Sequence, residues 1–188
     1  MIISLTGFMG CGKSSVGRKL SELLCCRFMD LDDCIVEKAG CSIPEIFAQQ
    51  GEPAFRKLEQ ETLKGIISNT DEDKTILALG GGAVMTEGSE KIVHEGTLCI
   101  YLKASVDTLL EHLSGETAGR PMLNQQTIVT NCSPSVMSSE VETSSLRTRI
   151  LELMARRAST YERTAHLIID IDGKDIDDVA AEITTKII

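Results

Sequence analysis

The first residues of the chain that could do chemistry form the string Gly7-Phe8-Met9-Gly10-Cys11-Gly12-Lys13-Ser14. This string fits the pattern G-x-x-x-x-G-K-[ST], in which glycines let successive backbone N–H groups point at one phosphate. In such a loop Lys13 places a positive charge beside the outer phosphates, and the Ser14 hydroxyl can ligate Mg²⁺. An apolar strand precedes the loop and a helix follows it, so the sequence predicts nucleoside triphosphate binding. The residues expected to contact the nucleotide are Gly10, Cys11, Gly12, Lys13, Ser14 and Ser15.

Two aspartates, Asp30 and Asp32, follow a short predicted strand over 27–29. Ligands of an open α/β sheet gather at the carboxyl ends of its strands, so both carboxylates are placed for chemistry. We expect Asp30 to help hold Mg²⁺ and Asp32 to accept a hydrogen bond, and a proton, from an acceptor hydroxyl. The alternative is that this pair only caps the next helix.

Arg56 and Glu59 are three residues apart in a predicted helix and therefore share one face. They form either an ordinary surface ion pair or a guanidinium held by a carboxylate, ready to bind a substrate carboxylate with its planar fork. The run Gly80 to Gly82 follows another strand. It indicates backbone that approaches a ligand closely, unless it is a plain tight turn.

Arg120 and Arg157 are two further candidates for binding an anion, and either could instead be a solvated surface charge. The polar segment 124–143 follows Arg120 and lacks hydrophobic periodicity. This composition predicts a surface loop, either part of a lid over the site or an inert insertion.

Apolar strands alternate with helices along the chain, which predicts one domain with a parallel sheet covered on both faces. The expected strands are 2–5, 27–29, 75–79, 97–102 and 166–171. The expected helices are 13–24, 32–39, 42–50, 52–68, 87–94, 105–113, 144–163 and 175–187.

Composition excludes several classes of function. The 188 residues carry a net charge of −9, which argues against a nucleic-acid partner. No apolar run approaches the length of a membrane span and no signal peptide is apparent, so we expect a cytoplasmic protein. The seven cysteines include no C-x-x-C pair and predict neither a metal site nor a disulfide framework. From its size we expect a monomer.

Together these motifs resemble shikimate kinase over most of the chain. The strings that carry the resemblance are GFMGCGKSSVGRKL, FMDLDDCIVEKAGCSIPEIFAQQGEPAFRKLE, LALGGGAV, GRPML and RRASTYE. The resemblance implies a three-layer α/β/α P-loop kinase fold with a central, mostly five-stranded parallel sheet. It also implies a substrate-binding helical subdomain at about 32–62 and a lid with an extended polar loop at about 114–143.

The activity that the resemblance implies is transfer of the ATP γ-phosphoryl group to the 3-hydroxyl of shikimate, with Mg²⁺, to give shikimate 3-phosphate in aromatic amino acid biosynthesis. Lys13, Asp32 and Arg120 would be catalytic, and Arg120 would also reach the nucleotide phosphates. The residues implied for the shikimate pocket are Asp32, Arg56, Gly80, Gly81, Gly82 and Arg157, and those for the metal are Ser14 and Asp30.

Two departures from the family concern the adenine. Arginines expected on either side of the base are replaced here by His112-Leu113 and by the turn Asp172-Gly173-Lys174. Adenine contacts are therefore not carried over. Alternatives in the same fold are a kinase for gluconate or for a nucleoside monophosphate; an alternative of another class is a regulatory ATP-binding module without catalysis.

Overall fold

A five-stranded sheet forms the centre of the protein, with strand order β2-β3-β1-β4-β5. A computed structural model describes residues 1–69, 74–114 and 139–187 of the chain, with side chains from 145 onward in the last range. All four strand pairs are parallel, which confirms the predicted fold class. The strands are β1 Ile2–Thr6, β2 Arg27–Asp30, β3 Thr75–Ala78, β4 Leu98–Lys103 and β5 Leu167–Asp170.

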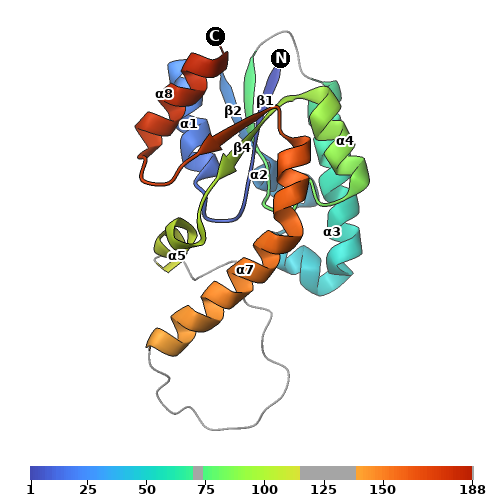
Figure 1. Cartoon of the computed structure of the whole chain (residues 1–188). Coiled ribbons are helices and arrows are strands. Elements are labelled where there is room, and N and C mark those ends of the chain that lie inside the picture. The colour runs from blue at the N-terminus through green and yellow to red at the C-terminus, as the bar shows by residue number, and fades with distance from the viewer. Residues whose placement is uncertain (70–73, 115–138, 188) are drawn as a thin grey trace.

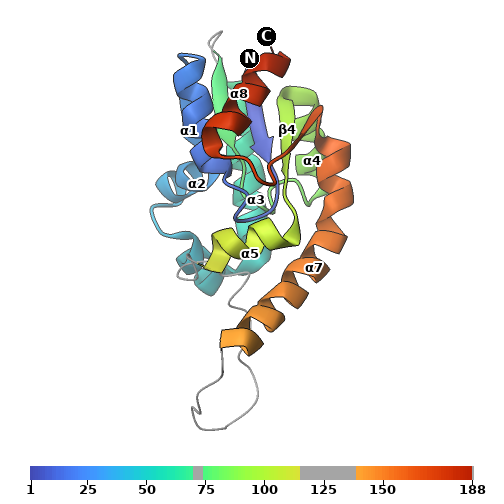
Figure 2. The same ribbon diagram turned by 60° about the vertical axis from the view of Figure 1, so that its left-hand side comes forward.

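Helices cover both faces of this sheet. They are α1 Lys13–Leu23, α2 Leu31–Ala39, α3 Ile43–Ser68, α4 Glu87–Gly96, α5 Val106–Ser114, α7 Ser139–Thr164 and α8 Ile176–Ile187. Figures 1 and 2 show α1 beside α8 on one face, and α3, α4 and α7 on the other. The three layers account for the strand sequences, because a strand buried on both faces is apolar throughout instead of alternating.

The core lies where β1 runs between β3 and β4. All five residues of β1 and all four of β3 are buried. Within β1, the polar residue Ser4 is satisfied by a hydrogen bond of 2.6 Å between its hydroxyl and that of Thr97. This packed centre fixes the carboxyl ends of the strands at one end of the molecule, the lower end in Figure 1.

The segments predicted to do chemistry leave the strands at that end. β1 leads into the glycine-rich loop, β2 into α2, and β3 into the run Gly80–Gly82. β4 leads into α5, and β5 into the turn before α8. The order of the strands therefore brings together motifs that lie far apart in the sequence.

Helix α3 matches the two helices predicted over 42–50 and 52–68, joined by a kink. Gly51 between them has φ 77° and ψ 173°, a backbone conformation that is essentially restricted to glycine. Glu45 caps the start of α3, because its carboxylate accepts hydrogen bonds from the Ser42 N–H and hydroxyl at 2.8 and 2.6 Å. The kink sets the direction of the second half of α3, which carries Arg56 and Glu59.

The prediction of an irregular loop through residue 143 is wrong at its end, because α7 begins at Ser139 and not near Ser144. From residue 145 onward, the first buried side chain of α7 is that of Ile150. Residues 139–144 include a single apolar residue, Val141, so hydrophobic periodicity could not reveal the start of the helix. Within the part of the chain that the structure describes, no helix is apolar and long enough to cross a bilayer.

We predict opposite effects on stability for alanine at two glycines of α3. Gly51→Ala should lower the free energy of unfolding by about 1–3 kcal/mol, because alanine is strained at a φ of 77°. Gly65→Ala is the matched control: a Cβ there meets nothing within 4 Å, so it should raise stability by about 0.5–1 kcal/mol. Urea unfolding of both variants checks this, and a Gly51→Ala protein as stable as the wild type would refute the role of the kink.

Candidate functional site

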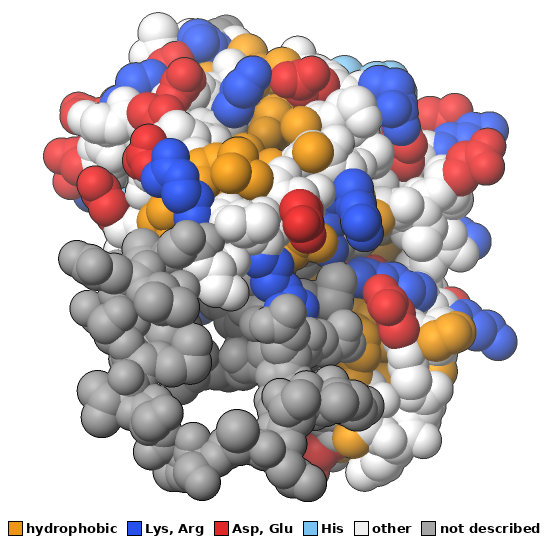
Figure 3. All heavy atoms as spheres, turned by 60° about the horizontal axis from the view of Figure 1, so that its bottom comes forward, with side chains coloured by type: hydrophobic (Ala, Val, Ile, Leu, Met, Phe, Trp, Pro, Cys, Tyr) orange, Lys and Arg blue, Asp and Glu red, His pale blue; other side chains and the backbone are white. Residues whose placement is uncertain are grey.

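A cleft of about 860 Å³ opens at the carboxyl end of the sheet. Its walls come from the glycine-rich loop, the starts of α2 and α3, the glycine run and the start of α8. The lining residues include Gly10, Gly12, Lys13, Ser14, Ser15, Asp30, Asp32, Ile43, Pro44, Gly80, Gly81, His112, Lys174, Asp175 and Ile176. Figure 3 turns this end of the molecule toward the viewer, and outside its grey part charged side chains of both signs lie around hydrophobic ones.

The glycine-rich loop has the backbone expected of an anion site. Gly7, Gly10 and Gly12 all have positive φ, and Gly12 directly precedes the first turn of α1. The Lys13 ammonium folds back over the loop and donates to the carbonyl oxygens of Gly7 and Phe8 at 3.0 and 2.9 Å. A helix N-terminus and a cation therefore face the same space, where they favour a phosphate.

Asp30 has two roles, one on each carboxylate oxygen. Its Oδ1 accepts the backbone N–H of Asp32 at 3.0 Å and so caps α2. Its Oδ2 accepts the hydroxyl of Ser14 at 2.6 Å, which brings together the two residues predicted to hold a metal. The capping alternative is therefore correct for Asp30, and its role as a metal ligand stays a prediction.

The oxygen donors of Ser14 and Asp30 fit Mg²⁺, which binds few protein oxygens and takes its other ligands from water and phosphates. Among the described residues, no group of three or more His, Cys, Asp or Glu side chains could hold a metal ion. The pair therefore suits an ion that arrives with phosphate ligands better than a metal held in a cage of protein ligands.

Asp32 lies against the glycine run. A Cβ added at Gly80 would be 2.8 Å from Asp32 Oδ1 and 3.4 Å from Glu59 Oε1. Burial raises the pKa of Asp32 most, the negative charge of Asp30 raises it further, and Lys13 opposes both. A carboxylate with a raised pKa is a better proton acceptor than an ordinary one.

Arg56 is held by two carboxylates, as the spacing predicted for one of them. Its Nη1 donates to Glu59 at 2.8 Å, and its Nη2 donates to Glu52 at 3.2 Å. The Glu59 side chain is 3% exposed, whereas that of Glu52 is 52% exposed. Burial raises the pKa of Glu59, although Arg56 opposes this. The contact with Glu59 is therefore the buried one, and that with Glu52 is open to water.

The guanidinium of Arg56 faces Gly82 directly. A Cβ added at Gly82 would lie 2.8 Å from both Nη1 and Nη2 of Arg56. No positive φ occurs at Gly80, Gly81 or Gly82, so this run is not required for an unusual turn. It lets Asp32 and Arg56 approach the backbone closely, within a turn in which the Ala83 N–H donates to the carbonyl oxygen of Gly80 at 3.0 Å. The close approach of a ligand to this run stays a prediction.

Arg157 is the most unusual cation near the cleft. Only 7% of the residue is exposed, and its Nη1 donates to the carbonyl oxygen of Gly81 at 3.5 Å. No carboxylate among the described residues pairs with it. A buried guanidinium without a counter-ion is costly, so this position favours an anionic ligand.

The structure therefore brings together most of the predicted site. Asp32, Gly80 and Gly81 line the cleft with the glycine-rich loop. Arg56 and Arg157 lie beside it and contact Gly82 and Gly81 respectively. Arg120 lies outside the described residues, as does the predicted loop from 124 to 138.

The sequence did not predict part of the cleft wall, namely Ile43, Pro44, Asp175 and Ile176. These residues begin α3 or flank the start of α8, and nothing local distinguishes them from ordinary helix starts. His112 and Lys174, at the positions where arginines were expected, also line the cleft. His112 Nδ1 lies 2.8 Å from the carbonyl oxygen of Gly10, so its ring contacts the glycine-rich loop itself.

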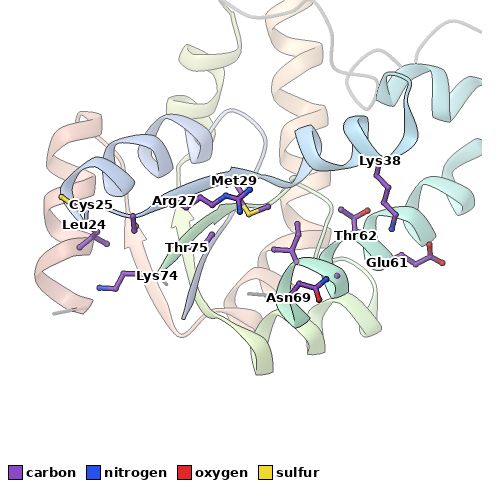
Figure 4. Close-up of a pocket in the computed structure, with 13 residues that line it drawn as sticks. Leu24, Cys25, Arg27, Met29, Lys38, Glu61, Thr62, Asn69, Lys74 and Thr75 are labelled. Atoms are coloured by element: carbon purple, nitrogen blue, oxygen red, sulfur yellow. The ribbon is translucent and has the colours of Figure 1, made fainter. Parts of the chain in front are cut away.

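A second cavity, of about 760 Å³, lies near the amino ends of β2 and β3 (Figure 4). Its walls come from the end of α1, the end of α2 and the second half of α3, and they include Arg27, Lys38, Glu61, Lys74 and Thr75. None of the predicted site residues lines it. The cavity at the carboxyl end is therefore the candidate active site.

Comparisons with known proteins agree with this geometry. The family model described as shikimate kinase matches residues 9–188. A shikimate kinase from Geobacter metallireducens is 40% identical over 97% of this chain and 89% of its own length. One from Thermus thermophilus is 35% identical over 98% of this chain and 89% of its own. The structure of a shikimate kinase from Acinetobacter baumannii in complex with shikimate is similar with a TM-score of 0.82 and 29% identity, covering 99% of this chain and 92% of that one.

We predict that Asp32→Asn stabilises the ligand-free protein at pH 7. Because its pKa is raised on folding, the folded state binds the Asp32 proton more tightly than the unfolded chain does. The wild type therefore loses stability as the pH rises above the ordinary aspartate pKa of 3.8 through the raised value. Asparagine avoids this loss, so the variant should melt at a higher temperature, and the gap should narrow as the pH falls.

Thermal melts at pH 7, 6, 5 and 4 test this prediction. Asp33→Asn is the matched control, since Asp33 is the next residue of α2 and is exposed. A melting temperature that does not rise in Asp32→Asn, or that rises equally in both variants, would contradict it.

Proposed function

The chain belongs to the shikimate kinase family and phosphorylates shikimate with ATP, and on this premise we propose a role for each residue of the site. The acceptor is the 3-hydroxyl of shikimate, and the products are shikimate 3-phosphate and ADP. The observation that supports this best is the buried Arg157, which pairs with no carboxylate of the described residues and lies beside the Asp32–Gly80 and Arg56–Gly82 contacts. A buried cation whose charge no described carboxylate offsets and a carboxylate with a raised pKa suit an acceptor that carries both a carboxylate and a hydroxyl.

We propose that residues 10 to 15 bind the ATP phosphates. The backbone N–H groups and the α1 N-terminus supply fixed positive dipoles, and Lys13 supplies a mobile charge. Its ammonium needs only to turn from the carbonyl oxygens of Gly7 and Phe8 toward the outer phosphates. His112 and the segment 174–176 lie on the cleft wall beyond the loop, where they would meet the rest of the nucleotide.

The shikimate carboxylate is bound, in this proposal, by Arg157 and Arg56. Arg157 has no carboxylate partner among the described residues, so the substrate would supply its counter-ion. Arg56 keeps Glu59 as a fixed support while the exposed Glu52 yields its place to the substrate. Two guanidinium groups then orient the ring, and orientation supplies much of the rate in phosphoryl transfer.

Asp32 holds the acceptor hydroxyl and takes up its proton as the oxygen attacks phosphorus. The pKa of Asp32 is raised by burial and by Asp30, which favours proton uptake at the carboxylate. Gly80 lets this carboxylate reach the turn where the ring would lie.

Ser14 and Asp30 would hold Mg²⁺, which neutralises charge on the phosphate oxygens when it is bound. Arg120, which lies outside the described residues, is proposed to add charge at the same phosphates. The helical segment 32–62 is proposed as the substrate subdomain and 114–143 as the lid. The assignments of Arg120 and of 114–143 rest on position in the sequence alone, whereas Ser14 and Asp30 also contact each other.

We also propose that the enzyme works as a cytoplasmic monomer. The cysteines among the described residues are all free thiols, as suits a reducing compartment. Gluconate and nucleoside monophosphates, the alternatives within this fold, are not favoured, because family membership points to shikimate.

ADP release by the purified protein tests the function directly. With MgATP, turnover should depend on shikimate and should be absent with gluconate, AMP or CMP. Turnover with one of these acceptors but not with shikimate would overturn the proposal.

We predict that Asp32→Asn lowers kcat by about 10²- to 10⁴-fold, because the acceptor proton loses its base. ATP affinity should remain near the wild-type value, since Ser14 and Asp30 retain their contact. Steady-state kinetics and calorimetric titration with ATP measure the two quantities. Near-normal turnover would remove Asp32 from the chemistry.

We predict unequal effects for the two carboxylates that hold Arg56. Glu59→Gln should raise the KM for shikimate by about tenfold or more, because the buried support of the guanidinium loses its charge. Glu52→Gln is the matched control and should change KM little, since that pair is exposed. Equal changes in the two variants would contradict the assignment of Glu59 as the support.

A further inference from the structure

Tyr161 connects helix α7 to the glycine run. It lies one helical turn after Arg157, and only 1% of the residue is exposed. Its hydroxyl donates a hydrogen bond to the carbonyl oxygen of Gly81. The same oxygen accepts Nη1 of Arg157 at 3.5 Å. One backbone carbonyl therefore meets both α7 side chains, and Tyr161 makes the closer contact.

The ring of Tyr161 is fixed from the opposite side by the sheet. It stacks on Tyr101 of β4 with ring centroids 5.2 Å apart and an interplanar angle of 29°. Tyr101 is paired in register with Thr6, the last residue of β1 before the glycine-rich loop. The hydroxyl is therefore held at one position relative to the carboxyl end of the sheet.

The Gly81 backbone is enclosed on its other side by the glycine-rich loop. A Cβ added at Gly81 would be 3.3 Å from the backbone nitrogen of Met9. The peptide that Tyr161 holds thus lies between the phosphate-binding loop and α7. A rotation of this peptide would also shift Gly80, which lies beside Asp32, and Gly82, which lies beside Arg56.

Arg157 depends on this carbonyl more than an ordinary arginine would. Its bond to Gly81 is its only hydrogen bond to the backbone within the described ranges, and no carboxylate there fixes its direction. Without the Tyr161 hydroxyl, the Gly81 oxygen would be free to take a closer bond from Arg157. The guanidinium would then turn toward the backbone and away from an incoming carboxylate.

We infer that Tyr161 is a positioning residue for the acceptor: its hydroxyl occupies the Gly81 carbonyl, which leaves the Arg157 guanidinium directed at the substrate carboxylate. The inference rests on the proposed function, because it names what sets the direction of one of the two arginines. Burial raises the pKa of Tyr161, so the phenol stays protonated and remains a donor across the working pH range.

The test compares Tyr161→Phe with Tyr101→Phe. Both variants remove one hydroxyl from the same ring stack, but the Tyr101 hydroxyl has no hydrogen-bond partner in the described parts of the chain. Tyr161→Phe should raise the KM for shikimate by about 5- to 20-fold, the effect of losing one buried hydrogen bond. Its KM for ATP should stay unchanged and kcat should fall less than about threefold. Tyr101→Phe should behave as the wild type.

Two further arms separate positioning from mere folding. Tyr161→4-aminophenylalanine keeps the ring and a hydrogen-bond donor, so its KM for shikimate should be close to that of the wild type. If the phenylalanine variant fails to fold, this variant still tests whether a donor at this position sets the KM. In an Arg157→Lys background, adding Tyr161→Phe should cost little further shikimate affinity in calorimetric titration, because the tyrosine acts through Arg157.

The outcomes that overturn the inference differ from those that overturn the function. Absence of shikimate-dependent turnover in the wild type refutes the function itself. Normal turnover in the wild type together with an unchanged KM in Tyr161→Phe refutes only the inference. Equal increases in KM for shikimate and ATP, or equal effects of the two phenylalanine variants, would show a purely structural role and also refute it.

Discussion

The acceptor half of the site depends on one steric constraint, the absence of side chains at Gly80, Gly81 and Gly82. Asp32 from α2 and Arg56 from α3 reach the first and last of these residues, and Tyr161 and Arg157 from α7 meet the carbonyl of the middle one. A side chain at the first or last position would occupy the space of a charged group within 3 Å. Side chains of α2, α3 and α7 can therefore converge here only because the three residues at the end of β3 are glycines.

Electrostatics then divides the two arginines into different roles. Arg56 has a buried carboxylate, Glu59, that offsets its charge without a ligand. Arg157 is buried and pairs with no carboxylate of the described residues, which leaves its charge to be offset by a ligand. Arg56 is thus already paired before the acceptor binds, whereas Arg157 is the arginine that an anionic acceptor stabilises more. The raised pKa of Asp32 follows from the same enclosure, since burial penalises its charge as well.

Much of this could be predicted from the sequence because the signals are local. Alternating apolar strands and helices predicted the sheet, and Gly51 separated two helical patterns where the structure has its kink. The start of α7 was missed because residues 139–144 include only one apolar residue, Val141, and so show no hydrophobic periodicity. The contact between Tyr161 and Gly81 could not be predicted, because it joins residues 80 positions apart and depends on the order of the strands.

In the proposed site, the carboxylate of the acceptor offsets the buried arginine charge. The most direct measurement is the thermal shift of the protein on adding shikimate or its methyl ester, each without nucleotide. The ester keeps the ring and hydroxyls but lacks the charge. Shikimate should raise the melting temperature, and by less at high salt, whereas the ester at equal concentration should leave it unchanged. An equal shift with both compounds would contradict it, because recognition would then not depend on the carboxylate.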